Sequence, residues 1–211
     1  PLAAKNILKV ENLAFERNDA LLFEPVSLHL NSGEALHIEG ANGVGKTTFF
    51  QILINLLEPS DGQIYFHGQI FNQCRYEYLS DVLFIGHQSG VKAALSVEEN
   101  LRWMSPSNTS SESIASALQS VGLEHYKNIP CYRLSAGQHR RVALARLMTT
   151  KASLWYLDEP FAALDKQGVA FIEVCMQAHL DRGGAMLFSS HQDLASIDTN
   201  SYRLHSFGGM V

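Results

Sequence analysis

A glycine-rich loop that ends in lysine and threonine constrains this chain more than any other feature. The loop fits the pattern G-x-x-x-x-G-K-S/T and consists of Gly40, Ala41, Asn42, Gly43, Val44, Gly45, Lys46 and Thr47. An apolar run precedes it, and apolar residues at helical spacing follow it. The glycines let backbone N–H groups converge on phosphates, and the start of a helix adds positive partial charge. Strand, loop and helix together predict a nucleoside triphosphate site.

The last residues of the loop are expected to contact the charged phosphates and the metal ion. Lys46 is expected to reach the β- and γ-phosphates, and Thr47 to place its hydroxyl on Mg²⁺, with Thr48 in the same nucleotide site. A chance glycine turn is the alternative, and the strand and helix around the loop argue against it. Kinases, GTPases and motor ATPases share such a loop, so other motifs are needed to infer which reaction the chain catalyses.

The rest of the chain predicts one mixed α/β domain over residues 1–211. Strands are expected at 8–15, 26–30, 35–38, 64–67, 82–85, 154–157 and 185–188, with 82–85 covered on both faces. The helix after the loop should bury Phe49, Ile52, Leu53 and Leu56 and stop at Pro59. Helical periodicity over 97–147, interrupted by a polar loop at 105–113, predicts an inserted helical subdomain at about 89–146. A further helix is expected at about 168–180.

Composition narrows the possible partners. Sixteen basic and twenty-one acidic residues give a net charge of -5, which offers no general attraction to nucleic acid. No apolar run reaches the roughly 18 residues that would span a bilayer, and no basic region with an apolar stretch begins the sequence. The three cysteines are far apart and fit reduced thiols, and the histidines form no metal-binding cluster. We therefore expect a soluble chain that reaches a membrane only through other subunits.

The segment Leu134-Ser135-Ala136-Gly137-Gln138 leads into a helical pattern and resembles the L-S-G-G-Q signature of ABC ATPases, with alanine at the first glycine. The resemblance implies that Ser135 and the N–H of Gly137 cap the γ-phosphate of ATP held on a second copy of the chain. Chemically this is reasonable, because a hydroxyl and a helix N-terminus form an anion site. An ordinary N-capped amphipathic helix is the alternative.

Further motifs complete the resemblance in the expected order. The apolar run Leu154 to Leu157 ends in Asp158 and Glu159 before Pro160, similar to the Walker B strand. Asp158 would hold Mg²⁺ through a water, and Glu159 would act as general base toward the attacking water. The resemblance also assigns Gln88 to the Q-loop, which touches Mg²⁺, Asp165 to the D-loop at the dimer interface, and His191 to the γ-phosphate. It implies the mixed-sheet fold of the P-loop ABC ATPases, with an antiparallel β subdomain and an inserted helical subdomain.

Two stretches narrow the resemblance within the family. Residues 85–92 and 158–169 look most like the haem-exporter type of ATP-binding subunit in bacterial cytochrome c maturation. That likeness implies integral membrane subunits as partners, a place at the cytoplasmic face of the inner membrane, and ATP hydrolysis that releases a haem-loaded chaperone. The alternatives are an ABC ATPase for another cargo such as a lipoprotein or small solute, a soluble ABC ATPase of DNA repair or translation, and a P-loop kinase.

The base pocket gives the first testable prediction. Many relatives stack an aromatic residue on adenine where this chain has Arg17, and a guanidinium plane can also stack on a base. Because such stacking selects shape weakly, we expect GTP to compete with ATP almost equally in a nucleotide-binding assay. A strong ATP preference that survives Arg17→Ala would mean that adenine is read elsewhere.

Overall fold

The computed structural model describes residues 5–192 and 196–208. By contacts, the chain divides into two compact units. The first takes its residues from Pro1–Phe84, Ala152–Asp158 and His179–Val211, and the second from Ile85–Lys151 and Glu159–Ala178. Each unit is described here by itself.

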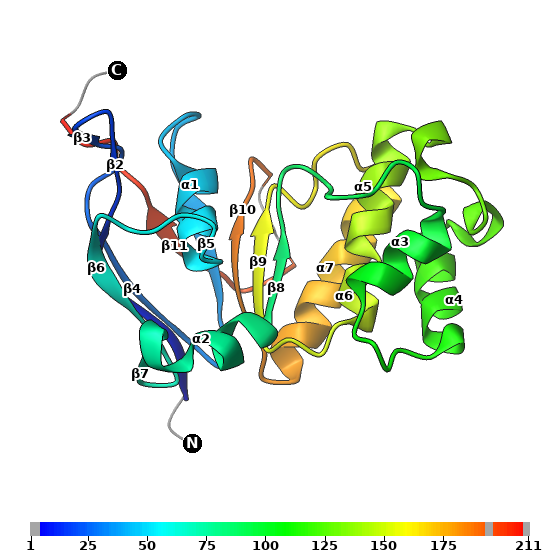
Figure 1. The fold of residues 1–211 in the computed structure, drawn as a ribbon, viewed down its shortest axis with the longest axis horizontal. Helices are drawn as coiled ribbons and strands as arrows, with labels where there is room; N and C mark the ends of the chain where they lie inside the picture. The colour runs from blue at the N-terminus through cyan, green and yellow to red at the C-terminus, as the bar shows by residue number, and fades with distance from the viewer. Residues whose placement is uncertain (1–4, 193–195, 209–211) are drawn as a thin grey trace. The chain divides into compact units, whose positions relative to one another are not determined.

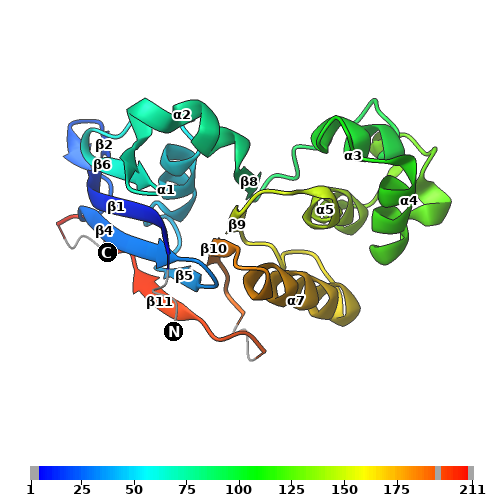
Figure 2. The same cartoon turned by 90° about the horizontal axis from the view of Figure 1, so that it is seen from below.

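The first unit contains an antiparallel sheet of four strands in the order β4-β1-β6-β7 (Figures 1 and 2). These strands are β1 (Asn6–Ala14), β4 (Val26–Asn31), β6 (Asp61–Phe66) and β7 (Gln69–Ile70). Val10 of β1 lies opposite Leu28 on one side and Ile64 on the other. All three are buried, so one face of the sheet supplies core while the alternate side chains are more exposed. A separate hairpin joins β2 (Glu16–Arg17) to β3 (Ala20–Leu21).

The second sheet has the strand order β11-β5-β10-β9-β8, and each pairing with a recorded register in it is parallel (Figures 1 and 2). Its strands are β5 (Ala35–Glu39), β8 (Val82–Ile85), β9 (Leu154–Asp158), β10 (Ala185–Ser189) and β11 (Asn200–Arg203). Every residue of β9 and β10 is buried. The expectation that 82–85 is covered on both faces is wrong. β8 lies at the edge of the sheet, and Val82 and Phe84 remain partly exposed.

Helix α1 (Lys46–Leu53) lies between the two sheets, and Phe49, Phe50 and Ile52 pack into the core that they share. The helix ends earlier than its apolar pattern predicts. Asn55 adopts a left-handed φ of 58°, and the N–H of Leu56 donates to the carbonyl of Gln51. This Schellman-type cap stops the helix before Pro59 is reached. Leu56 is therefore not buried as expected but 67% exposed.

Helix α2 (Phe71–Ser80) is absent from the sequence-based prediction. Only Cys74 and Tyr78 are buried in it, and a non-helical φ/ψ at Cys74 kinks it, so no helical apolar stripe marks it in the sequence. The hydroxyl of Tyr78 makes a 2.6 Å hydrogen bond with the hydroxyl of Tyr156 on β9. Both rings are fully buried, and burial raises the pKa of both phenols.

The second unit is helical. It contains α3 (Val97–Met104), α4 (Ser111–Ser120), α5 (Ala136–Leu144), α6 (Arg146–Thr149) and most of α7 (Lys166–Asp181), with 3-10 turns at Glu124–Tyr126 and Cys131–Arg133. Its apolar core joins residues of α3, α4 and α5. The polar loop is shorter than expected, because Ser110 caps α4 and residues 111–113 are helical. Among the described residues, no helix combines the length and apolar character needed to cross a membrane.

The tyrosine pair predicts a coupled effect on stability. Tyr78→Phe should lower the free energy of unfolding by about 1–3 kcal/mol, because it leaves the buried Tyr156 hydroxyl without this partner. Tyr156→Phe should act similarly, and the double variant should lose less than the sum. Chemical denaturation of the four proteins measures this. Additive losses would show that the two hydroxyls do not depend on each other.

Candidate functional site

The glycine-rich loop joins β5 to α1 in the first unit. Gly45, the residue before the helix, has a φ of 109°, and a Cβ there would lie 2.8 Å from the Phe23 ring and 2.9 Å from Leu22. Glycine is thus required for both the backbone conformation and the close packing. Within the described residues, no side chain caps α1 at Gly45. The first turn can therefore direct N–H groups toward an anion.

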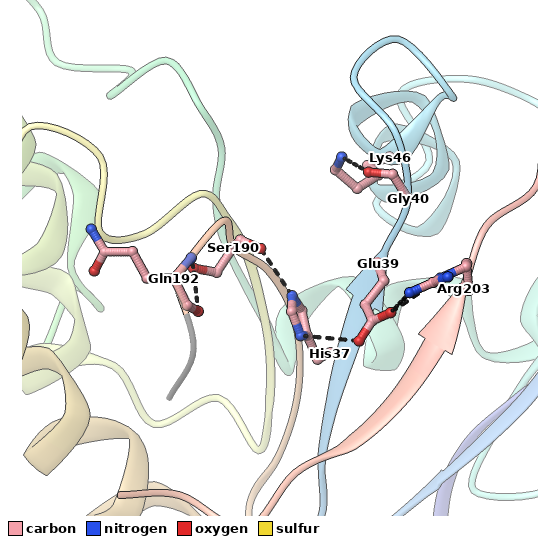
Figure 3. A network of polar contacts seen from close by, with 7 residues as sticks. All are labelled: His37, Glu39, Gly40, Lys46, Ser190, Gln192 and Arg203. Atoms are coloured by element: carbon pink, nitrogen blue, oxygen red, sulfur yellow. Dashed lines mark hydrogen bonds and ion pairs between the residues drawn. The ribbon is translucent and has the colours of Figure 1, made fainter. Parts of the chain in front are cut away.

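Lys46 folds back over this loop. Its Nζ donates to the carbonyl of Gly40 at 2.7 Å (Figure 3). It also donates to the carbonyl of Ala41 at 3.3 Å. A cavity of about 810 Å³ lies beside the loop and is lined by residues 40–44 and 203–206. The free volume thus lies beside the backbone of the loop, whose N–H groups can bind phosphate oxygens. Thr48, also expected in this site, is buried in α1.

Asp158, at the end of β9, is a buried carboxylate, with 2% of its surface exposed. Thr47 Oγ1 donates to Asp158 Oδ2 at 2.7 Å, and Ser189 Oγ on β10 donates to Oδ1 at 2.7 Å. The structure therefore brings together Thr47 and Asp158, which the sequence assigned to one metal. Ser189 was missed, and the signal for it is its place at the end of the neighbouring apolar strand.

A second polar network supports the strand that leads into the loop (Figure 3). His37 stacks on Phe188 with 4.8 Å between ring centroids, and its Nε2 hydrogen-bonds with the Ser190 carbonyl. Glu39 accepts from the Arg203 guanidinium at 2.9 Å, which holds the pKa of the Glu39 carboxyl below its usual range. The network spans β5, β10 and β11 and was not predicted. Its polar members occupy ordinary strand positions, so no motif marks them.

Other expected site residues are exposed or belong to the second unit. Arg17 is exposed on β2, opposite Ala20. His191 is exposed two residues beyond β10, and Gln88 is exposed beyond β8 in the second unit. Glu159 is half-buried and adopts a left-handed φ of 51° directly after Asp158.

The signature segment begins α5 in the second unit. The Ser135 hydroxyl accepts from the Gln138 N–H at 3.2 Å, and the Gln138 side chain accepts from the Ser135 N–H at 2.9 Å. This capping box explains why serine and glutamine stand three residues apart. A Cβ at Gly137 would lie only 3.0 Å from the Ala163 carbonyl oxygen, whereas Ala136 is exposed. Close approach thus calls for glycine at 137, and position 136 has room for alanine.

Asp165 lies at the start of α7 in the same unit. Its Oδ1 accepts from the Gly168 N–H at 2.9 Å, and its Oδ2 accepts from Arg141 of α5 at 2.9 Å. The Gly168 hydrogen bond, together with the Arg141 charge, lowers the pKa of the Asp165 carboxyl. The carboxylate thus caps α7 and links it to α5.

Known proteins share this set of motifs. The sequence profile of the ABC transporter family matches residues 23–162, which include the phosphate loop, the signature and the acidic pair. The chain belongs to the ABC transporter family. It is an ATP-binding subunit of this family, with ATPase activity of the ABC transporter type.

Similar sequences agree over most of their length. A cytochrome c biogenesis ATP-binding export protein CcmA from Pseudomonas fluorescens (strain Pf0-1) is 44% identical over 191 residues, which cover 90% of each chain. The protein of the same description from Pasteurella multocida (strain Pm70) is 40% identical over 203 residues, which cover 95% of each. This chain is therefore similar to these CcmA proteins in sequence over nearly its whole length, and not only in fold.

Solved structures confirm the expected fold class. An ATP-binding subunit of an ABC transporter superposes with a TM-score of 0.82 at 22% identity, covering 94% of this chain and 86% of that chain. A putative ABC transporter ATP-binding protein from Pyrococcus furiosus gives 0.80 at 24% identity, covering 94% and 98%. At these identities the likeness concerns the fold alone. The mixed α/β ABC ATPase fold, with its antiparallel sheet beside a parallel one, is thus established.

The contact at Gly137 predicts a position-specific effect. Gly137→Ala should lower ATP turnover about tenfold, because the added methyl group pushes the start of α5 away from Ala163. The exposed neighbour gives the matched control, and Ala136→Gly should stay within about twofold of the starting turnover. Steady-state ATP hydrolysis compares the two. Unchanged turnover in Gly137→Ala would mean that the start of α5 can shift without harm.

Proposed function

We propose that this chain is the ATP-hydrolysing subunit of the membrane complex that matures c-type cytochromes in bacteria. The observation that carries the proposal is 40% to 45% identity over about 90% of the chain to CcmA proteins of cytochrome c biogenesis. ATP hydrolysis would drive the release of a haem-loaded chaperone. An ABC ATPase that serves a lipoprotein or small-solute transporter is the second candidate, because cargo is selected mainly by membrane subunits.

The first unit supplies the phosphate and metal groups of the proposed site. Thr47 Oγ1 and the Asp158 carboxylate lie in hydrogen-bond contact, and such oxygen atoms are the ligands that Mg²⁺ prefers. Bound there with ATP, Mg²⁺ would neutralise charge on the β- and γ-phosphates. Lys46 is half-buried and can exchange its two carbonyl acceptors for phosphate oxygens. The N–H groups of residues 40–48 would bind the remaining phosphate oxygens.

Glu159 is the proposed general base. It follows the buried Asp158 directly, so its carboxylate belongs to the carboxyl end of β9, where ligands bind in α/β sheets of this kind. The carboxylate would take a proton from the attacking water. Gln88 and His191 would orient the water and the γ-phosphate. Arg17 would stack on the adenine ring of ATP.

The signature segment acts, by this proposal, on a second copy of the chain. Ser135 and Gly137 stand exposed or half-exposed at the start of α5, where a helix N-terminus can bind an anion. Two copies would close on two ATP molecules, with Asp165 at the dimer interface. Integral membrane subunits would hold the dimer at the cytoplasmic face of the inner membrane. The inserted helical subdomain at about 89–146 would be the part that meets them.

Glu159→Gln tests the chemistry and the dimer together. The variant should retain ATP binding, lose turnover by a factor of roughly 100 or more, and elute as a dimer when ATP is present. ATP hydrolysis, equilibrium binding and size-exclusion chromatography measure these three properties. Glu58→Gln is the matched control, since Glu58 is exposed outside the site. Turnover near the starting value would remove Glu159 as the base.

The same variant separates the cytochrome role from other cargo. In cells that carry Glu159→Gln in place of the native protein, the chain should still co-purify with its membrane subunits, while haem-stained c-type cytochromes should be lost. The Glu58→Gln cells should keep them. Normal c-type cytochromes in cells whose ATPase is inactive would reject the cytochrome role and leave the ABC ATPase with another cargo.

A further inference from the structure

Arg140, in the second turn of α5, is buried although it carries a charge. Only 4% of its surface is exposed. Its guanidinium donates to three backbone carbonyls: Gly86 at 2.6 Å, Glu159 at 2.6 Å and Pro160 at 3.3 Å. Burying a guanidinium is costly unless its donors are satisfied, and these carbonyls supply acceptors that offset the cost.

The three carbonyls belong to the segments that carry the proposed chemistry. Gly86 is the first residue after β8 and lies two residues before Gln88. Glu159 and Pro160 form the exit of β9. One planar group therefore joins the start of the Q-loop segment to the backbone of the proposed general base, and all four residues lie in the second unit.

The backbone of Glu159 needs such a restraint. Its φ of 51° is left-handed, a conformation that is unfavourable for a non-glycine residue and persists only where surrounding contacts enforce it. The Arg140 contact to the Glu159 carbonyl is one of the shortest that the guanidinium makes. A change in that peptide orientation would move the carboxylate attached to the same residue.

Neighbouring contacts keep Arg140 in place. Gly137, Arg140 and Arg141 share one face of α5 at helical spacing, and each touches the segment 159–165: Gly137 approaches Ala163, and Arg141 pairs with Asp165. The first two turns of the helix that starts at the signature thus contact the loop that follows Asp158.

We propose that Arg140 is a positioning residue for ATP hydrolysis, which sets the orientation of Glu159 through its backbone carbonyl and fixes the start of the Gln88 segment relative to it. The inference rests on the proposed role of Glu159 as general base. A misplacement of the order of 1 Å can cost about 100-fold in rate, so loss of this contact reduces turnover rather than ATP binding.

The test is a double-mutant cycle on the purified full-length chain with Mg·ATP. Arg140→Gln should lower kcat about 10–100-fold and change KM for ATP by less than about threefold. In the Glu159→Gln background, the same change should lower the residual turnover by less than about twofold, because the base through which Arg140 acts is already absent. Arg140→Lys, which can reach fewer carbonyls, should restore part of the loss. Arg102→Gln removes an exposed arginine of the same unit and should leave kcat unchanged.

The outcomes separate the two claims. If Glu159→Gln is inactive but Arg140→Gln keeps kcat within about threefold, the positioning role is wrong and the proposed function stands. Equal losses in both backgrounds, or a main effect on KM, would show a merely structural role and overturn the inference. If Glu159→Gln hydrolyses ATP normally, the proposed base itself fails. Should Arg140→Gln not fold, the cycle is run with Arg140→Lys, for which a kcat loss confined to the wild-type background supports the proposal and its absence rejects it.

Discussion

The buried carboxylate of Asp158 is the group on which the first unit's site depends. An unpartnered carboxylate at 2% exposure would be strongly unfavourable, and the hydroxyls of Thr47 and Ser189 each donate to one of its oxygens. Those donors are in place only if α1 starts at the end of the loop and β10 pairs in register with β9, where Ser189 lies beside Asp158. The need to supply hydrogen-bond donors to this one carboxylate therefore links the apolar strands to the phosphate loop.

In the second unit, helix α5 holds an irregular loop in place. Segment 159–165 has few backbone hydrogen bonds of its own, and one face of α5 supplies the missing contacts through close packing, carbonyl hydrogen bonds and an ion pair. The sequence between Gly137 and Arg141 thus has two tasks. Its first residues belong to the signature, and its next turn contacts the loop that carries Glu159.

Sequence patterns predicted the parts of the molecule whose physics is local. Apolar runs located the central strands. The loop motif and the resemblance to the Walker B strand assigned Thr47 and Asp158 to one metal, and the structure brings the two side chains into contact. Helix α2 was missed because its burial is limited to a few residues, and Leu56 was misplaced because a left-handed Asn55 ends α1 early. The carbonyl contacts of Arg140 could not be predicted, since they join segments distant in sequence through backbone atoms that any residue possesses.

The stretch that follows Asp158 combines several departures from ordinary local rules. Glu159 and Ala163 both adopt positive φ without being glycine, and the arginine buried beside them has backbone carbonyls as partners. Proteins tolerate such strain where function needs a fixed geometry, and they enforce it with surrounding contacts. Here Phe161, 3% exposed, anchors the middle of the stretch in the core, and α5 restrains both ends. A loop free to relax would let Glu159 adopt a right-handed backbone, and its carboxylate would then no longer have the fixed direction that a general base requires.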